Sequence, residues 1–259
     1  MSKGTWNPSQ YEKFKNERSQ PFIDLMNMVH PIPNGKAIDL GCGTGELTQT
    51  LHKYLEAAST VGLDSSTEML KESEKFSGDG VSFVMGDIKT WSEKEKYGVV
   101  FSNAAIQWCE NHREIFQHLY DALVDGGQLA VQMPMNHDFP THILSKQMSH
   151  EPRWKAALGG ATYDKPDVML SVEEYAKLLF KLGFREQTVT MKVYGHVLNS
   201  REEVIEWVKG SMLTHFRSHM SEDNYKEFLQ EYRERLFQFL PDEKPFFYPF
   251  KRILLWAKK

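Results

Sequence analysis

The sequence predicts an α/β fold, a doubly wound and mostly parallel sheet with helices on both faces. The first observation is a short apolar run at 37–40 that stops at three alternating glycines, Gly41, Gly43 and Gly45, beyond which apolar residues recur at helical spacing. The second is that further short apolar runs along the chain are followed by a turn signal and an amphipathic helix. Repeated strand, turn and helix units are typical of a parallel sheet.

The composition limits the possible classes of function. The chain has 259 residues, 41% hydrophobic and 25% charged, which suits one large α/β domain. Its net charge of -4 predicts no general affinity for nucleic acid or acidic membranes. The sequence has no signal-peptide core and no run of about 18 apolar residues, so we expect a cytoplasmic protein. Its two cysteines, Cys42 and Cys109, provide neither a disulfide framework nor a C-x-x-C metal site, and no metal is expected.

The glycine loop, residues 41–45, distinguishes two kinds of cofactor. A dinucleotide-binding loop reads G-x-G-x-x-G, whereas here the third glycine comes one residue early and Glu46 takes its place. Such glycines let the backbone come close to a ligand at a helix N-terminus. With Asp39 before it, the loop resembles the first motif of the class I S-adenosylmethionine (SAM)-dependent methyltransferases. Cys42 is interpreted as a small buried hydrophobe rather than a nucleophile.

The next strand is predicted at 59–64 and ends in an acidic residue. Asp64 lies about 20 residues past Gly45, where a carboxylate should accept hydrogen bonds from a ribose diol. Ser65 begins a capping box that predicts the following helix. The alternative interpretation of Asp64 is therefore a turn residue at the start of that helix.

A third strand is predicted within residues 81–88, and it too is followed by a carboxylate. Asp87 and the apolar Ile88 suit an adenine site, where the carboxylate accepts from the exocyclic amine and the aliphatic side chain lies against the ring. A dehydrogenase needs only the first strand-end carboxylate. Asp87 therefore favours SAM over NAD as the cofactor.

The fourth strand is predicted at 97–103 and the fifth at 128–133. In open α/β sheets, ligands bind outside the carboxyl ends of the strands. Asn103, Gln107 and Trp108 follow the fourth strand and should therefore face the reacting centre. Trp108 is explained equally well as core packing.

The expected organisation is a single domain with insertions. In the N-terminal arm, Ser19 and Pro21 are interpreted as helix start signals. Beyond the fifth strand the sequence turns polar, with loop signals, and the strand pattern is absent. Ser171 then begins a predicted helix, and alternating apolar residues at 188–197 predict a strand. The predicted parts are an arm at 1–30, a SAM-binding core at 31–134, lid insertions at about 135–170 and 200–240, and a final strand at about 246–257.

A family resemblance extends along nearly the whole chain. It is carried by W-N-P-S at 6–9, D-L-G-C-G-T-G at 39–45, S-N-A-A-I-Q-W at 102–108, A-V-Q-M-P at 130–134 and P-F-K-R-I at 249–253. Together these segments resemble the trans-aconitate 2-methyltransferases. Membership implies a seven-stranded Rossmann-like sheet with helical lid insertions, in which the last strand runs antiparallel between two others.

The resemblance also implies a cofactor, SAM, with S-adenosyl-L-homocysteine as its product. The cofactor residues implied are Tyr11, Arg18, Asp39, Gly41, Cys42, Gly43, Gly45, Asp64, Ser65, Asp87, Ile88 and Asn103. The acceptor would be a carboxylate with a pKa near ~4, which is already ionised at neutral pH, so no general base and no catalytic residue are predicted. Catalysis would come from holding oxygen, methyl and sulfur in line in a dry site.

A small polycarboxylic acid, most simply trans-aconitate, needs polar and cationic hosts, and arginine is the best partner for a carboxylate. The candidates are Gln107, Trp108, His137, His142, Arg153, Arg217 and Arg252. Taken singly, each cation is better explained as a solvated surface charge. The expected partners are this acid and neither nucleic acid nor membrane, with the chain acting as a monomer. Alternatives are methylation of another small acid, such as an isoprenoid acid, a SAM-binding protein without turnover, and a nicotinamide oxidoreductase.

Overall fold

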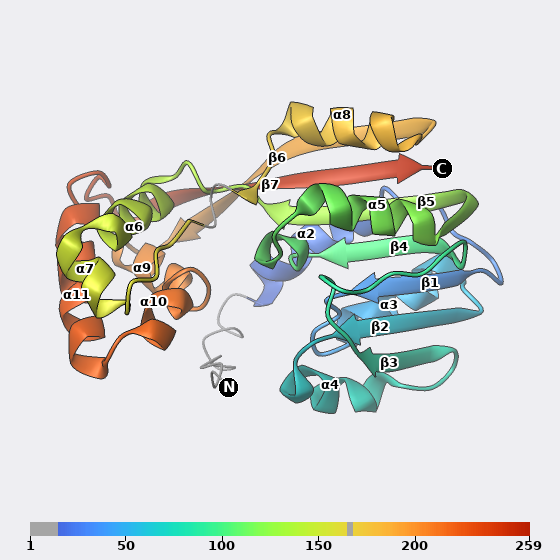
Figure 1. Ribbon diagram of the computed structural model, residues 1–259, viewed down its shortest axis with the longest axis horizontal. Coiled ribbons are helices and arrows are strands. Elements are labelled where there is room, and N and C mark those ends of the chain that lie inside the picture. Colours follow the sequence, from blue (N-terminus) through green and yellow to red (C-terminus); the bar gives the residue numbers. More distant parts are fainter. Residues whose placement is uncertain (1–14, 165–167) are drawn as a thin grey trace. The chain divides into compact units, whose positions relative to one another are not determined.

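The computed structural model describes residues 15–164 and 168–259, with side chains from residue 19 onward (Figure 1). Contacts divide the chain into two compact units. The sheet unit comprises Arg18–Pro134, Val168–Lys192 and Arg252–Lys259, and the described part of the helical unit lies within residues 15–17, Met135–Asp167 and Val193–Lys251. The expected single domain with lids stays a prediction.

Seven strands form one sheet. They are β1 (Lys36–Leu40), β2 (Ser59–Asp64), β3 (Val81–Met85), β4 (Tyr97–Asn103), β5 (Leu123–Pro134), β6 (Glu186–Leu198) and β7 (Phe246–Lys258). Their order is β3-β2-β1-β4-β5-β7-β6, with β1 to β5 parallel and β7 antiparallel to β5. The predicted mostly parallel, seven-stranded sheet with an antiparallel last strand is confirmed. The strand order reverses between β1 and β4, and such a switch point is where open α/β sheets bind ligands.

Helices cover both sides of the sheet (Figure 1). Those of the sheet unit are α2 (Lys15–Met26), α3 (Glu46–Leu55), α4 (Thr67–Ser73), η1 (Glu74–Phe76), η2 (Ile106–Trp108), α5 (His112–Ala122) and α8 (Val172–Leu182). Apolar residues of α2 and α3 share one buried cluster with Phe101 of β4 and Ala130 of β5. Helices α5 and α8 pack together, with the rings of Phe116 and Tyr175 5.5 Å apart. This arrangement confirms the doubly wound fold.

The helical unit has its own apolar core. Its helices are α6 (Pro140–His150), α7 (Pro152–Ala157), α9 (Glu202–Lys209), α10 (Leu213–His219) and α11 (Glu222–Leu236), and the last residues of β6 and the first residues of β7 also belong to it. Trp154, Phe216 and Phe228 are among its buried side chains, and the last two rings stack at 4.4 Å. No helix within the described residues is both long and apolar enough to cross a membrane.

Several helix boundaries differ from the prediction. Helix α2 begins at Lys15, not near Pro21, which lies inside it; the hydrogen bond that Pro21 removes is outweighed by burial of the apolar face that begins with Phe22. Helix α4 is capped by Ser66 rather than Ser65, because the Ser66 hydroxyl accepts from the Met69 amide at 3.3 Å.

The segment after β5 was expected to be a helical insertion, and it contains the two helices α6 and α7. Leu144 and Met148 lie four residues apart on the buried side of α6, among serines and threonines that dilute the apolar pattern. Three fully buried polar residues of this helix, Thr141, Ser145 and Ser149, reinforce that dilution. The helix start predicted at Ser171 is confirmed: Ser171 and Glu174 form a capping box with hydrogen bonds of 3.2 and 2.9 Å at the start of α8.

Candidate active site

The glycine loop joins β1 to α3, and its glycines have different roles. Gly41, Gly43 and Gly45 all have positive φ, at 79°, 56° and 80°. A Cβ on Gly41 would lie 2.2 Å from the Cβ of Ala105, and one on Gly45 would lie 2.5 Å from the ring of Phe83. At Gly43, no atom of the described residues lies within 4 Å of that position. Gly41 and Gly45 therefore permit packing, whereas Gly43 leaves open space over the loop.

The end of β2 holds the glycine loop in place. The Gly41 amide donates to the Leu63 carbonyl at 2.7 Å, and the Gly43 amide donates to Asp64 Oδ2 at 2.9 Å. The other carboxylate oxygen, Oδ1, accepts from the Ser66 amide at 2.9 Å, as the turn interpretation of Asp64 expects. Each oxygen retains a further acceptor position, so these contacts leave room for a ribose hydroxyl. Ser65, beside it, is exposed.

Asp39 is a buried carboxyl group on β1. Its Oδ2 accepts from the Thr48 hydroxyl at 2.6 Å. Burial raises the pKa of Asp39 to about 7, although the Thr48 hydrogen bond opposes this and the charge of Asp64 adds to it. The thiol of Cys42 is also buried, and burial raises its pKa well above the usual range, with further contributions from the same two carboxylates. Cys42 is thus held neutral, as expected for a small buried hydrophobe.

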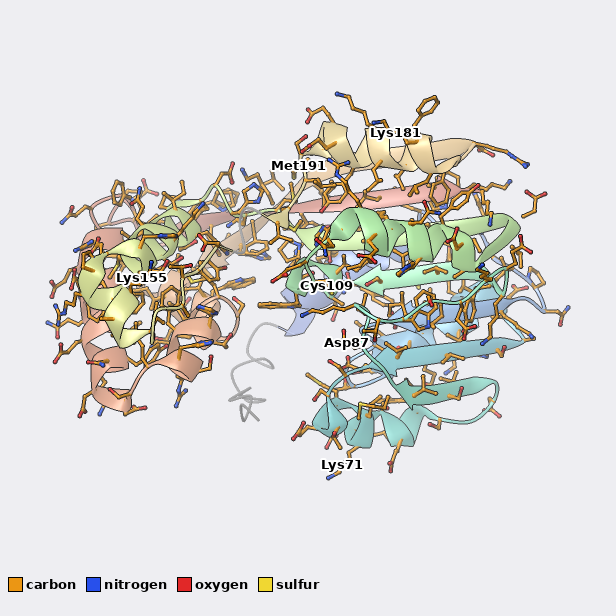
Figure 2. All side chains as sticks on the ribbon, in the orientation of Figure 1. Lys71, Asp87, Cys109, Lys155, Lys181 and Met191 are labelled. Carbon is orange, nitrogen blue, oxygen red and sulfur yellow. The ribbon has the colours of Figure 1, made fainter. Side chains whose placement is uncertain are left out.

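The segment after β3 reaches the glycine loop. Ile88 Cδ1 lies 3.7 Å from the position that a Cβ on Gly41 would take. Asp87 Oδ1 accepts from the Lys89 amide at 3.0 Å, and this contact fixes the start of the following turn. Figure 2 labels Asp87 and Cys109 at the edge of the sheet unit toward which the arrows of β1 and β4 point. Asp64, Asp87 and the glycine loop therefore lie at the same edge of the sheet, at the carboxyl ends of the strands.

This edge suits the groups that SAM presents. Gly43 leaves space at a helix N-terminus, Asp64 offers carboxylate oxygens at the end of the neighbouring strand, and Ile88 supplies an apolar surface beside the loop. These are the features that a nucleoside with a ribose diol requires. The assignment of individual residues to individual parts of the cofactor stays a prediction.

The segment after β4 is anchored to β5. The Ala104 amide donates to the Gln132 carbonyl at 2.9 Å, and the Gln107 side chain donates to the Ala104 carbonyl at 2.6 Å. Asn103 lies at the end of β4, in register with Gln132 of β5. Trp108 is 45% exposed, so its interpretation as core packing is wrong.

A histidine that the sequence reading missed supports the same segment. His112 is buried at the start of α5, where its Nε2 lies 3.1 Å from the Ile106 carbonyl and 3.2 Å from the Cys109 carbonyl. Nε2 must therefore carry the hydrogen, and Nδ1 accepts from the Tyr175 hydroxyl at 2.6 Å. Burial lowers the pKa of His112 and keeps it neutral. No sequence signal linked this histidine to Tyr175, which lies 63 residues further along the chain.

The predicted substrate residues are divided between the two units. Gln107, Trp108 and Arg252 belong to the sheet unit, and His137, His142, Arg153 and Arg217 belong to the helical unit. Arg252 is buried on β7, in register with Pro134 at the end of β5. Arg217 is exposed on α10. Tyr11 and the Arg18 side chain lie outside the described residues.

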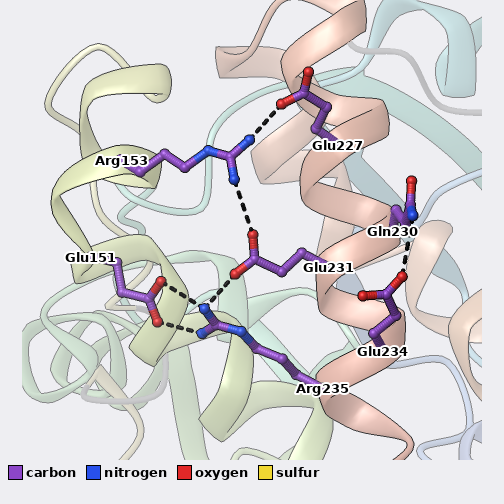
Figure 3. Close-up of polar contacts among 7 residues, drawn as sticks. All are labelled: Glu151, Arg153, Glu227, Gln230, Glu231, Glu234 and Arg235. Atoms are coloured by element: carbon purple, nitrogen blue, oxygen red, sulfur yellow. Dashed lines mark hydrogen bonds and ion pairs between the residues drawn. The ribbon is translucent and has the colours of Figure 1, made fainter.

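Arg153 already has two carboxylate partners (Figure 3). Its guanidinium lies 2.5 Å from Glu227 and 3.4 Å from Glu231 of α11, on the solvent-exposed surface of the helical unit. It also lies over the Trp154 ring at 4.3 Å. Because its charge is balanced by two acids, Arg153 is a weaker host for an anionic substrate than the sequence suggested.

His142 is a neutral group at physiological pH. Burial lowers its pKa to about 4, and the neighbouring His137 contributes in the same direction. Its Nδ1 lies 3.0 Å from the Thr141 hydroxyl. A neutral imidazole can hydrogen-bond a carboxylate but brings no positive charge, so His142 does not provide the cationic contact expected of it.

The fold and this edge of the sheet define a class I SAM-dependent methyltransferase. Residues 37–127 match the methyltransferase domain family. Among solved structures, the YcgJ protein from Bacillus subtilis is similar with a TM-score of 0.61 and 11% identity, over 93% of this chain and 98% of that one.

The full-length relatives define the family more narrowly. The chain is 37% identical to the trans-aconitate 2-methyltransferase of Deinococcus radiodurans over 98% of both chains. It is 33% identical to that of Streptomyces avermitilis, over 98% of this chain and 97% of the relative. The chain belongs to the trans-aconitate 2-methyltransferase family.

Proposed function

We propose that this enzyme methylates a carboxylate of trans-aconitate, or of a closely related small polycarboxylic acid, to give the monomethyl ester. The observation that carries the proposal is the 37% identity to a trans-aconitate 2-methyltransferase over 98% of both chains. Bound SAM supplies an electrophilic methyl group on a sulfonium. The chain's own residues then have to bind, orient and dehydrate the two reactants.

The cofactor would lie over the ends of β1, β2 and β3. In this arrangement Asp64 would accept hydrogen bonds from the ribose, and Asp87 and Ile88 would contact the adenine. Gly43 provides the open space over the loop. Ionised Asp39 would favour the positively charged groups of the methionine end, although it is too deeply buried to be a surface contact.

The acceptor would lie on the other side of the glycine loop, over β4 and β5. An acid of this kind carries its own nucleophile, because a carboxylate with a pKa near ~4 is ionised at neutral pH. The protein therefore has no proton to remove. Its contribution is to fix the carboxylate oxygen in line with the methyl group and to exclude water. Among the described side chains of the sheet unit, the buried Arg252 at the end of β5 would bind a second carboxylate.

The proposal is tested with purified protein, methyl-labelled SAM and a panel of di- and tricarboxylates, set beside monocarboxylic isoprenoid acids. We expect trans-aconitate to be among the best acceptors and the label to be released by mild base, as from a methyl ester. A label that resists base because it sits on carbon or nitrogen contradicts the carboxyl assignment. An isoprenoid acid that outperforms every polycarboxylate contradicts the substrate class.

A further inference from the structure

Two glutamines four residues apart on β5 differ completely in their hydrogen bonding. Both point to the same face of the strand, since side chains alternate along it. Gln128 uses its whole amide: Oε1 accepts from the His30 amide at 2.9 Å and from Trp256 Nε1 at 3.1 Å, and Nε2 donates to the His30 carbonyl at 2.9 Å. Gln132 is 0% exposed, and within the described side chains neither its Oε1 nor its Nε2 has a partner.

An unpaired amide at this depth is unfavourable for folding alone. Buried polar groups are nearly always hydrogen-bonded, because they have given up water without a replacement. An apolar side chain of similar size would fill the same space without that cost. The carboxamide here therefore points to a partner outside the described side chains, and a bound ligand is the partner that we consider.

The neighbours of Gln132 indicate what that partner is. Asn103, in register on β4, also has a buried oxygen, Oδ1, without a partner in the described part of the chain. On β7 the buried Arg252 lies in register with Pro134, two residues beyond Gln132 and on the same face. These strands are separated by β1 from β2 and β3, whose ends carry the carboxylates suited to the nucleoside. The unpaired amides thus lie on the acceptor side of the sheet.

We propose that Gln132 binds the acceptor acid, donating from Nε2 to an oxygen of the carboxylate that is methylated. This proposal rests on the function proposed above and names a residue for it. A neutral amide can orient a carboxylate without neutralising it, whereas a guanidinium on the attacking oxygens would reduce their nucleophilicity. Gln132 suits the reacting carboxylate, and the arginine suits one that does not react. Because the amide is buried, the contact forms when the side chains over the strand end shift around the ligands.

The test compares Gln132→Met with Gln128→Met, the same change on the same face of the same strand. Gln132→Met should unfold at the wild-type temperature or above it and bind SAM normally, while kcat/KM for the acid falls about 10- to 100-fold. Gln128→Met should lower the unfolding temperature, because it leaves the His30 backbone groups and Trp256 unpaired, and it should keep the wild-type KM for the acid.

The outcomes separate this proposal from the proposed function. Wild-type protein that methylates no polycarboxylate refutes the proposed function itself. If wild-type protein is active and Gln132→Met has an unchanged kcat/KM, the role of Gln132 is refuted. The role is also refuted if Gln132→Met loses stability and SAM affinity to an extent that accounts for all of its lost activity. Should Gln132→Met not fold, a crystal structure of wild-type protein with S-adenosylhomocysteine and the acid decides: a carboxylate oxygen within about 3.2 Å of Gln132 Nε2 supports the proposal, and a greater separation overturns it.

Discussion

Thr48 of α3 donates its hydroxyl hydrogen to Asp39 of β1 across 2.6 Å, and both side chains are buried. This hydrogen bond stabilises the ionised carboxylate, yet burial outweighs it and the pKa of Asp39 rises to about 7. The first strand of the sheet thus carries a group that changes charge near physiological pH. Two measurable consequences follow, one for stability and one for cofactor binding.

The free energy of unfolding should fall as pH rises from about 4 to 7. The folded pKa of Asp39 lies above the unfolded value of about 4, so between these values the folded chain binds more protons than the unfolded chain. Asp39→Asn removes this dependence. Its stability relative to wild type should improve by roughly 2–3 kcal/mol between pH 5 and 8, measured by urea unfolding. Asp125→Asn, at an exposed ion pair, is the control and should show little change; parallel curves for Asp39→Asn and wild type would refute the shifted pKa.

Affinity for SAM should increase with pH through the same range. A sulfonium and an ammonium group favour ionised Asp39, so binding below about pH 7 must release its proton. Calorimetry in buffers of different ionisation enthalpy should detect that proton, and Asp39→Asn should release fewer. S-adenosylhomocysteine, which lacks the sulfonium charge, should show a weaker dependence. At saturating SAM, kcat should stay nearly constant from about pH 6.5 to 8.5, since the acid is ionised throughout.

Alanine at two positions of the glycine loop should separate cofactor binding from folding. Gly43→Ala places a methyl group in open space at positive φ, so it should cost about 1–2 kcal/mol of stability while lowering SAM affinity at least about tenfold. Gly45→Ala adds a clash with Phe83 to the same backbone strain and should be considerably less stable. Thermal unfolding and calorimetry measure the two effects. Equal SAM affinity in Gly43→Ala and wild type would mean that the cofactor does not approach this part of the loop.

Asp64→Ala should lower SAM affinity by about thirtyfold, equivalent to about 2 kcal/mol for the lost charge-assisted hydrogen bonds. Ser66→Ala is the matched control, because Ser66 caps α4 through the Met69 amide while the Asp64 carboxylate stays in place. It should lose about 1 kcal/mol of stability and retain SAM affinity. If both variants weaken SAM equally, Asp64 acts only by shaping the turn and the ribose assignment fails.

The sheet was predictable because each strand of its parallel part is a short apolar run with its own turn signal. The prediction for 59–64 matches β2, and that for 97–103 matches β4. Local sequence was sufficient for these strands, because a parallel strand that is buried on both faces is a continuous apolar run and is easily recognised. The strand-end carboxylates could also be located, because the carboxyl ends of parallel strands all lie at the same edge of the sheet.

Partnerships between distant residues could not be read in this way. Gln128 and Gln132 are the same residue type on the same predicted strand, and the sequence does not distinguish them. Only the fold gives Gln128 the His30 backbone and Trp256 as hydrogen-bond partners. Arg153 was predicted to bind the substrate, but in the structure it forms ion pairs with two carboxylates of α11. Such pairings depend on which faces of two helices pack against each other, and the charge of a residue does not predict this packing.

The position of β7 bears on how the chain is made. This strand follows β6 in the sequence but lies between β5 and β6 in the sheet. During synthesis β6 therefore emerges from the ribosome without a neighbour to pair with, and the edge of β5 stays open until the residues from Phe246 onward have been translated. Pairing across such long sequence separation is slow, and unpaired edges invite aggregation. The nascent chain should consequently depend on chaperones late in translation, after its first five strands have already formed.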